Sequence, residues 1–322
     1  MNGIPFCSSY SLEEIRSDQK TLPSDTLRTF RGKILKDLWI HQENHKRTNI
    51  QICRQLFGKS LEDVEIEWPP PKSPPKGTVN DYTLGGISVL QYLWTEQRQN
   101  GGLGYHWGHK EFEELRIKKK IGCGFYSEDH CDEMILKYQS MIQNKTAIVV
   151  GSQSPWAEAS LFNAGARHVM TIEYMKITTD YPNYSALHPS EVAKKYLNRS
   201  WSLIDFAYSY SSLEHDGLGR YGDPLNPFGD FESLARIRCL LKPGGTLFLS
   251  LPVAPDTVVW NLHRIYGRYR LSLMLMGWDI LDIFPETCNV DDPKLHGNYK
   301  CQPLLVLQKP LPSPLPSAQP LR

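Results

Sequence analysis

Short apolar segments that alternate with helical patterns constrain the fold of this chain most. Four such segments, each typical of a strand buried on both faces, occupy residues 146–151, 168–174, 202–210 and 246–253. Helical periodicity separates them, at residues 156–164, 189–197 and 231–241. Strands that alternate with helices form a parallel sheet with right-handed crossovers. The sequence therefore predicts a doubly wound α/β domain.

The last part of this domain has a different pattern. A helix is expected over roughly 259–276, and two further apolar segments follow at 278–284 and 303–309. These two segments have no helical pattern between them, so we expect them to form an antiparallel pair that closes the sheet.

The rest of the chain reads as extensions of the α/β domain. Helical faces within 24–40, 49–57 and 81–99 and five prolines in WPPPKSPPKG suggest the division. We divide the chain into an N-terminal helical extension (1–67), a Pro-rich linker (68–77), a helical lead-in (78–126), the α/β domain (127–309) and a disordered Pro-rich tail (310–322). A docking site for a proline-binding domain is the alternative for the linker.

Charge and hydropathy exclude some classes of protein. Lys and Arg number 36 and Asp and Glu 35, so the net charge of +1 gives no electrostatic reason to expect a nucleic-acid partner. No run of about 18 apolar residues predicts a membrane span, and the N-terminus lacks the pattern of a signal peptide. We therefore expect a soluble protein with a cytoplasmic location, while its oligomeric state stays open.

Seven cysteines are scattered along the chain without a C-x-x-C pair. This spacing predicts neither a zinc site nor a disulfide framework, and we expect buried free thiols in a reducing compartment. Three N-x-S/T sequons, at Asn144, Asn183 and Asn198, are interpreted as chance occurrences.

The turn VVGSQSPWAEA, residues 149–159, is the first candidate for ligand binding. A strand ends at Gly151 and a helix begins near residue 155, so unpaired backbone N–H groups and a helix N-terminus face a ligand there. Glu173 lies 22 residues beyond Gly151 at the end of the next strand, where a carboxylate can accept hydrogen bonds from two ribose hydroxyls. The predicted nucleoside-binding residues are Gly151, Ser152, Gln153, Glu173, Tyr174, Ser209 and Tyr210. The alternative is an ordinary turn and a surface role for Glu173.

The loop SYSSLEHDGLGRYGDP, residues 209–224, is the candidate catalytic segment. Ligands of open parallel sheets bind beyond the carboxyl ends of such strands, and this loop is dense in ionisable groups. We expect a general acid or base among Glu214, His215 and Asp216. Two alternatives stay open: Glu214 bonds the loop backbone while His215 is merely packed, or the three side chains together hold a metal ion.

Basic and aromatic residues near this loop are the candidates for substrate contact. Arg220 and Tyr221 belong to the loop itself, and Arg264 and Arg268 lie on the basic face of the segment NLHRIYGRYRLSL. They could grip an anionic or sugar-like group. The alternative for the two later arginines is a solvated basic face.

Taken in order, the segments TAIVVGS, TIEY, LIDFAYSYSSLEH, LKPGGTLFLSLPV, GWDILDIF and LLVLQK resemble the class I S-adenosylmethionine-dependent methyltransferases. More narrowly, GSQSPWAEA, SSLEHDGLGRYGDP and HRIYGRYRLSLMLMGWDILD look like a family of unknown function first defined on nematode proteins. The resemblance implies a Rossmann-like, doubly wound, mostly parallel seven-stranded sheet with an antiparallel last strand. This chain departs from the methyltransferase pattern in its single glycine, Gly151, and in having only Ser190 and Glu191 where an acid would hold adenine.

The resemblance implies S-adenosylmethionine as cofactor and a methyltransferase that acts on a small-molecule or glycan-like acceptor. His215 or Glu214 would take the acceptor proton, and no metal is expected in this mechanism. Two alternatives are a non-catalytic binding module on a degenerate methyltransferase fold and a metal-assisted enzyme that uses Glu214, His215 and Asp216.

Overall fold

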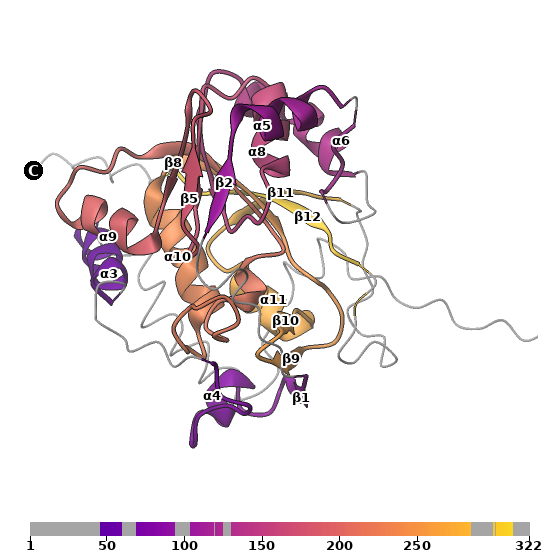
Figure 1. The fold of residues 1–322 in the computed structure, drawn as a ribbon. Helices are drawn as coiled ribbons and strands as arrows, with labels where there is room; N and C mark the ends of the chain where they lie inside the picture. Colours follow the sequence, from indigo (N-terminus) through magenta and orange to yellow (C-terminus); the bar gives the residue numbers. More distant parts are fainter. Residues whose placement is uncertain are drawn as a thin grey trace, which may run out of the picture.

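A seven-stranded sheet forms the centre of the molecule in the computed structural model (Figure 1). The structure describes residues 46–59, 69–93, 104–118, 120–124, 130–284, 299 and 301–311. The strands lie in the order β11 (Asp279–Phe284), β12 (Leu304–Gln308), β8 (Leu241–Ser250), β7 (Ile204–Tyr210), β3 (Thr146–Val150), β4 (His168–Ile172) and β6 (Tyr184–Leu187). The helix expected within 24–40 and the tail beyond 311 lie outside the described residues.

The directions of these strands confirm the expected fold class. Strands β6, β4, β3, β7 and β8 are parallel to one another, whereas β12 is antiparallel to both β8 and β11. The antiparallel strand is the last one in the chain, as predicted. The fold is a Rossmann-like, mostly parallel α/β sheet.

Helices cover both faces of the sheet because successive side chains of a strand point to opposite faces. Ile148 packs into a core with residues of one set of helices, while its neighbours Ala147 and Val149 pack into a second core on the other face. The first face carries α3 (Lys46–Lys59), α9 (Pro189–Leu197), α10 (Gly229–Leu240) and α11 (Arg268–Met274). The second face carries α5 (His109–Arg116), α6 (His130–Lys137), α7 (Gln139–Ile142) and α8 (Trp156–Asn163).

The helix expected over 259–276 is wrong in its first half. This segment contains the strands β9 (Thr257–Trp260) and β10 (His263–Ile265) before α11 begins. Thr257, Val258 and Val259 are β-branched and favour extended backbone, and β9 pairs in parallel with β1 (Val89–Tyr92). The partner strand comes from far away in the sequence, so local periodicity could not reveal this pairing.

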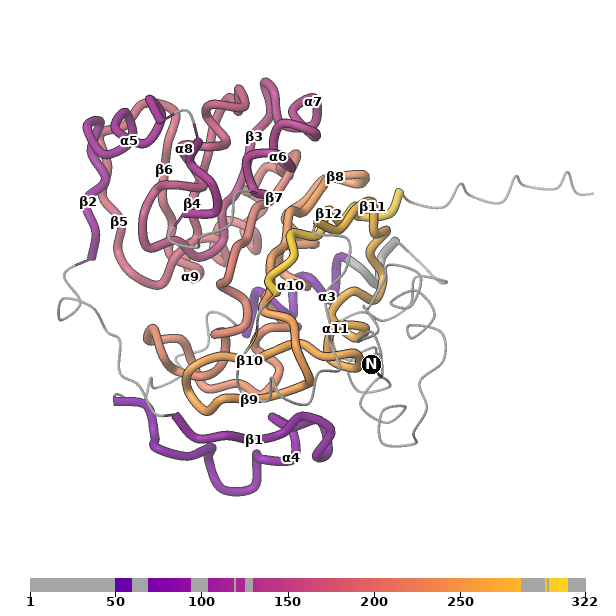
Figure 2. The backbone as a smooth tube through the Cα atoms, turned by 90° about the vertical axis from the view of Figure 1, so that its right-hand side faces the viewer, coloured from indigo at the N-terminus to yellow at the C-terminus, as the bar shows by residue number. Residues whose placement is uncertain are grey.

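The helical pattern predicted over 81–99 is also largely wrong. The described part of this segment contains the end of the short helix α4 (Val79–Tyr82) and then β1, which lie next to β9 in Figure 2. Strand β2 (Tyr105–Trp107) pairs with β5 (Ile177–Thr179), a strand that the sequence did not indicate. The predicted boundaries of the extensions stay a prediction, although these pairings tie the segment before residue 127 to the α/β domain.

The expectation of free buried thiols is wrong for the cysteines that the structure describes. One disulfide joins Cys53 in α3 to Cys239 in α10, and a second joins Cys123 to Cys131. Cys301 is also disulfide-bonded. Residues that lie 186 positions apart in the sequence meet only in the folded chain, so spacing did not predict the first bond.

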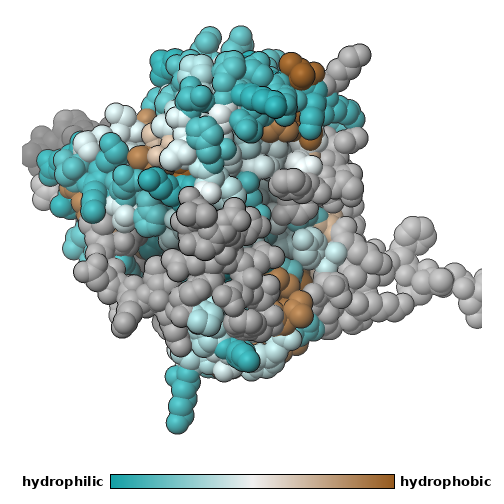
Figure 3. All heavy atoms as spheres, in the orientation of Figure 1, coloured by the Kyte–Doolittle hydropathy of each residue, from teal (hydrophilic) through white to brown (hydrophobic). Residues whose placement is uncertain are grey.

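The surface gives little sign of a large apolar interaction site on the face that Figure 3 shows, where apolar residues gather only in small separate patches within the described part. None of the helices that the structure describes combines the length and the apolar character needed to cross a bilayer.

Candidate functional site

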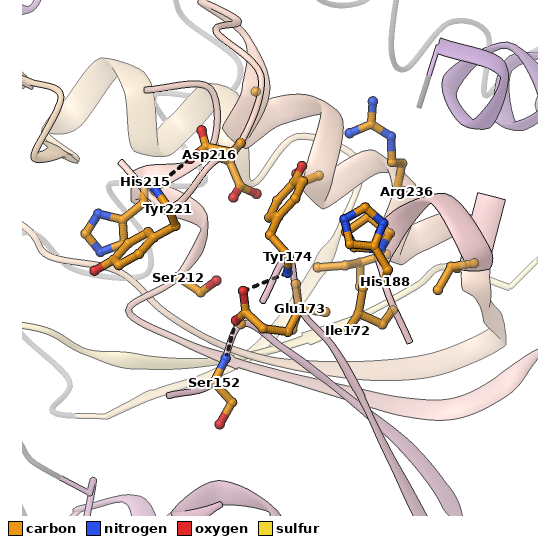
Figure 4. A pocket seen from close by; sticks show the side chains of 18 of the residues that line it. Ser152, Ile172, Glu173, Tyr174, His188, Ser212, His215, Asp216, Tyr221 and Arg236 are labelled. Carbon is orange, nitrogen blue, oxygen red and sulfur yellow. Dashed lines mark hydrogen bonds between the residues drawn. The ribbon is translucent and has the colours of Figure 1, made fainter. Parts of the chain in front are cut away.

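A cavity of about 820 Å³ lies at the carboxyl edge of the parallel strands β6, β4, β3 and β7 (Figure 4). The segments that directly follow these strands line it, including Gly151, Glu173, His188 and Ser211. In the sheet, β3 lies between β4 on one side and β7 on the other, so the chain changes direction along the sheet at this point. Open α/β sheets bind ligands at such a switch point.

Glu173 connects the ends of two strands at the floor of this cavity. Its Oε2 accepts a hydrogen bond from the backbone N–H of Ser152 at 2.9 Å, and its Oε1 accepts from the N–H groups of Tyr174 at 2.7 Å and Met175 at 3.3 Å. Burial raises the pKa of the carboxyl, although these N–H donors act in the opposite direction. The turn after β3 and the acid at the end of β4 therefore face one common cavity.

The structure explains the glycine at position 151 by a contact within the protein and not by the approach of a ligand. Its φ of +73° is in the left-handed region, and a Cβ added there would lie 1.9 Å from Oγ of Ser212. The close approach that this glycine permits is thus to Ser212 of the neighbouring loop. The next residues of the turn, Gln153 and Ser154, have backbone N–H groups that meet no acceptor within the described part of the protein.

Behind this turn lies a buried acid that the sequence reasoning missed. Glu158 in the first turn of α8 is fully buried and accepts hydrogen bonds from Oγ1 of Thr171 at 2.6 Å and Oγ of Ser152 at 3.3 Å. Burial raises its pKa to about 7. The signal was present in the sequence, because this acid interrupts an otherwise apolar and small-residue stretch of the predicted helix.

Aromatic side chains form part of the cavity wall. The ring of Trp156 lies edge-on to Tyr208 and Tyr210, with centroid distances of 6.0 and 5.5 Å. Tyr174, which also lines the cavity, lies edge-on to His188 with a centroid distance of 5.7 Å. Two aromatic groups at the ends of β4 and β6 give this part of the cavity flat, partly apolar walls.

The loop after β7 brings the predicted catalytic residues to different places. His215 and Asp216 line the cavity, whereas Glu214 is buried beneath it. Oε1 of Glu214 accepts a hydrogen bond from Ser211 at 2.5 Å, and its Oε2 has no partner among the described residues. Burial raises the pKa of Glu214 to about 7. Glu214 thus bonds within its own loop through the side-chain hydroxyl of Ser211.

His215 is held as a neutral imidazole. Its Nδ1 lies 2.6 Å from the backbone oxygen of Leu262, and because a carbonyl only accepts, Nδ1 is assigned the proton and Nε2 the lone pair. Burial, together with Arg220, holds the pKa of His215 well below its ordinary value. Asp216 accepts a hydrogen bond from Ser233, and burial raises its pKa well above the ordinary range.

The arrangement gives no support to a metal ion held by this loop. The ligand atoms of Glu214, His215 and Asp216 do not converge on one point. Within the described ranges, the group that does converge consists of Cys123, His130 and Cys131, and its two cysteines form a disulfide.

The structure corrects the prediction that Arg264 contacts the substrate. Its side chain is fully buried and donates hydrogen bonds to backbone oxygens of the connection between β7 and α10, including that of Asp216 at 2.6 Å and that of Asn226 at 3.3 Å. A guanidinium held by carbonyl groups stabilises the loop and is not free to bind a ligand. Arg268 begins α11 and is not part of the cavity lining.

The remaining predicted residues divide between lining and support. Tyr221 lines the cavity, and Arg220 lies over its ring at 4.9 Å while donating to the backbone oxygen of Leu262. Tyr210 also lines the cavity, whereas Ser209 is buried and donates to the backbone oxygen of Val150.

Other lining residues were missed because tertiary contacts place them there. His188 follows β6, a short strand that the sequence did not indicate. Lys59 and Arg236 come from α3 and α10 and flank Glu232, at N–O distances of 3.2 and 2.8 Å. His188 and Glu191 cap α9, since Nδ1 of His188 accepts from the N–H of Ser190 at 3.2 Å and Glu191 accepts from the N–H of His188 at 2.9 Å.

Comparisons with solved structures give low similarity over more than half of the chain. A candidate methyltransferase, yhhF of Escherichia coli, is 9% identical, with 57% of this chain and 87% of that chain covered and a TM-score of 0.35. A candidate S-adenosylmethionine-dependent methyltransferase of Listeria monocytogenes is 14% identical, with coverages of 55% and 97% and a TM-score of 0.35. The N-methyltransferase NodS of Bradyrhizobium japonicum, solved with S-adenosyl-L-homocysteine, is 8% identical, with coverages of 63% and 98% and a TM-score of 0.33. At these values the likenesses say nothing of activity.

Sequence comparison is more specific. No curated protein matches the chain. Residues 144–303, however, match the family described as Caenorhabditis protein of unknown function, DUF268. This range contains the turn after β3, Glu173, the loop after β7 and α11, which are the segments on which the resemblance was based. Over residues 144–303 the chain is therefore similar to this Caenorhabditis family of unknown function, and this range contains most of the Rossmann-like sheet.

Proposed function

We propose that this protein is an S-adenosylmethionine-dependent methyltransferase whose cofactor binds in the cavity at the carboxyl edge of the sheet. One observation carries the proposal: the turn after β3 and the carboxylate of Glu173 face the same cavity at the switch point of the sheet. A nucleoside with two ribose hydroxyls is the ligand that an acid in this position suits.

The residues present fit an adenosyl ligand with an amino-acid tail. A carboxylate offers about four lone-pair positions, and three backbone N–H groups occupy the carboxylate of Glu173, so one position remains for a ribose hydroxyl. The unpaired N–H groups of Gln153 and Ser154, just before α8, would hold the ligand's carboxylate. The flat walls formed by Tyr174 and His188 would hold the base.

When bound, the cofactor supplies a methyl group that is already activated by a sulfonium, so the protein mainly has to align the acceptor and remove its proton. His215 suits the second task because its imidazole is neutral and its Nε2 carries the lone pair. Glu214, 3.7 Å from that nitrogen, would stabilise the imidazolium that forms. Tyr221 lies edge-on to the ring of His215 at 5.1 Å and holds it in place.

The acceptor is proposed to be a polar small molecule or a glycan-like compound. Ionisable groups, among them the carboxyl groups of Asp216 and Asp223 and the guanidinium of Arg236, surround the part of the cavity beyond Tyr174. Such a lining suits an acceptor with several hydroxyl groups better than an apolar one.

A non-catalytic binding module remains the second candidate, and two observations favour it. Ser212 occupies the space beside Gly151, and Glu191 is engaged with His188 in capping α9. In that case the cavity would bind a ligand without turning it over.

Calorimetric titration of the purified full chain with S-adenosylhomocysteine tests the proposal. We expect saturable binding that weakens at least tenfold in Glu173→Gln, because the amide cannot replace a charged acceptor and about 1.4 kcal/mol corresponds to tenfold. Glu114→Gln, at an exposed position of α5, is the matched control and should bind like the unmodified protein. Absence of heat in the unmodified protein, or equal affinity in Glu173→Gln, would refute cofactor binding in this cavity.

A further inference from the structure

Disulfide bonds indicate the redox conditions in which this chain matures. Cys53 is bonded to Cys239, Cys123 to Cys131, and Cys301 is disulfide-bonded as well. Disulfides form and persist in oxidising compartments and are rare in the cytosol, where thiols are kept reduced. Disulfides at these positions therefore favour an oxidising compartment over the cytoplasmic location that the sequence first suggested.

The sequons form a second and independent set of observations. Asn144, Asn183 and Asn198 are each followed two residues later by Thr or Ser, and all three asparagines are exposed. Within the described residues, their side-chain amide nitrogens donate no hydrogen bond. Glycosylation of Asn-x-Ser/Thr adds a bulky group that needs such a surface position.

The fold places all three asparagines away from the cavity. Asn144 precedes β3, Asn183 precedes β6, and Asn198 ends α9 in the connection that leads to β7. They therefore lie before the amino ends of strands whose carboxyl ends form the cavity, and none of them lines it. A glycan at each position would leave the cavity open.

Backbone geometry offers a competing reason for two of these residues. Asn144 and Asn183 have φ values of +60° and +61°, and asparagine tolerates this left-handed conformation better than most residues. The turn explains the asparagine but does not require a hydroxyl two residues later. Asn198 is not among the residues with positive φ, and it accepts hydrogen bonds from Ser200, the third residue of its own sequon.

We infer that this chain matures in an oxidising, glycosylating compartment and carries N-linked glycans on Asn144, Asn183 and Asn198. In each glycan transfer the asparagine Nδ2 loses a proton and forms a bond to the anomeric carbon of a lipid-linked oligosaccharide. The bond between that carbon and the pyrophosphate breaks, and the lipid pyrophosphate leaves. In each disulfide two thiols lose two protons and two electrons to a disulfide-type oxidant of the same compartment. The inference does not depend on the proposed methyltransferase activity.

Peptide mass spectrometry of the natural protein tests this inference. The chain is tagged at its own locus, purified under alkylation without reductant, and digested before and after treatment with an amidase that releases N-glycans. We expect each of the three asparagines to be converted to aspartate by the amidase, and Cys53 and Cys239 to appear as one linked pair. Unmodified asparagines would overturn the glycan assignment, and alkylated Cys53 and Cys239 would overturn the oxidising compartment.

Variants at one sequon provide a matched series. Ser200→Ala destroys the sequon, so amidase treatment should shift its gel mobility less than that of the unmodified protein. Ser200→Thr keeps the sequon, so its shift should equal that of the unmodified protein. Asn80→Gln, at an exposed asparagine outside any sequon, should leave the shift unchanged. An equal shift in Ser200→Ala and Ser200→Thr would overturn glycosylation at Asn198, whatever the outcome of the S-adenosylhomocysteine titration.

Discussion

Two physical reasons require a glycine at position 151 in the turn after β3, and the substitution Gly151→Ala tests both. The first reason is backbone conformation: a φ of +73° costs an L-residue about 1–2 kcal/mol. The second is space: the added Cβ would lie 1.9 Å from Oγ and 2.6 Å from Cβ of Ser212, and such overpacking costs about 1–3 kcal/mol. We therefore expect Gly151→Ala to lower the free energy of unfolding by about 2–5 kcal/mol.

Removing the side chain of Ser212 should recover only the second part. Without its Oγ and Cβ, the nearest remaining atom of this residue is its Cα, at 3.8 Å from the added methyl group. In a Ser212→Gly background, Gly151→Ala should therefore cost about 1–2 kcal/mol. Gly222→Ala is the matched control, because Gly222 has a φ of +86° and a Cβ there meets no atom within 4 Å.

Urea unfolding of the four proteins of this cycle and of the control measures these differences, provided that the m-value stays constant. The coupling between Gly151 and Ser212 should be about 1–3 kcal/mol. The reasoning is refuted if Gly151→Ala costs the same in both backgrounds to within about 0.5 kcal/mol, or costs no more than Gly222→Ala. Either result would mean that the turn after β3 and the loop after β7 are not in contact as described.

Further predictions concern the free energy of unfolding, measured with urea. Burial raises the pKa of Glu158 from 4.5 to about 7, so the folded state keeps a proton that the unfolded state releases, and stability falls as pH rises through this window. From pH 5 to pH 8, the free energy of unfolding of Glu158→Gln should therefore rise by about 2–3 kcal/mol relative to that of the unmodified protein. A difference between the two proteins that stays constant over this range would contradict the prediction. Asp230→Ala leaves the buried guanidinium of Arg270 without the carboxylate that it contacts at 2.8 Å through Nε and Nη2. This substitution should lower the free energy of unfolding by about 3–5 kcal/mol, and a decrease under about 1 kcal/mol would show that the pair is hydrated. Replacing both Cys53 and Cys239 by Ser opens a crosslink between residues 186 positions apart and should cost about 2–5 kcal/mol in oxidised protein, with no loss if the bond does not form.

The elements of the α/β core could be predicted because their signals are local. Helix α9 has its predicted bounds, since Pro189 suits the first turn of a helix and Glu191 reaches back to the N–H of His188. Strands β3 and β7 are largely apolar and buried because helices cover both faces of the sheet. Such patterns arise within one element and can be read without knowing its neighbours.

Strands with distant partners could not be predicted in the same way. Strand β9 is stabilised by pairing with β1, a segment more than 150 positions earlier in the chain. Strand β6 has only four residues and lies at the edge of the sheet, so its signal was too short. Its absence from the prediction is also why His188 was missed at the cavity.

The candidate site shows the same division. Glu173 was found because an acid at the end of the second strand has a characteristic spacing from the glycine turn. Arg264 was assigned to the wrong place, because a basic pattern does not show whether a guanidinium faces solvent or the carbonyl groups of a buried loop.

By itself, the sequence determined the α/β class, the order of the main strands and helices, and the presence of a turn and an acid suited to a nucleoside. These features depend on hydrophobic periodicity and on spacing along the chain, which are properties of neighbouring residues. The tertiary structure alone decided that Ser212 fills the space beside Gly151, that Arg264 holds the loop after β7 and that Cys53 meets Cys239. Contacts of this kind join segments far apart in the sequence, so they exist only once burial of the apolar faces has brought those segments together.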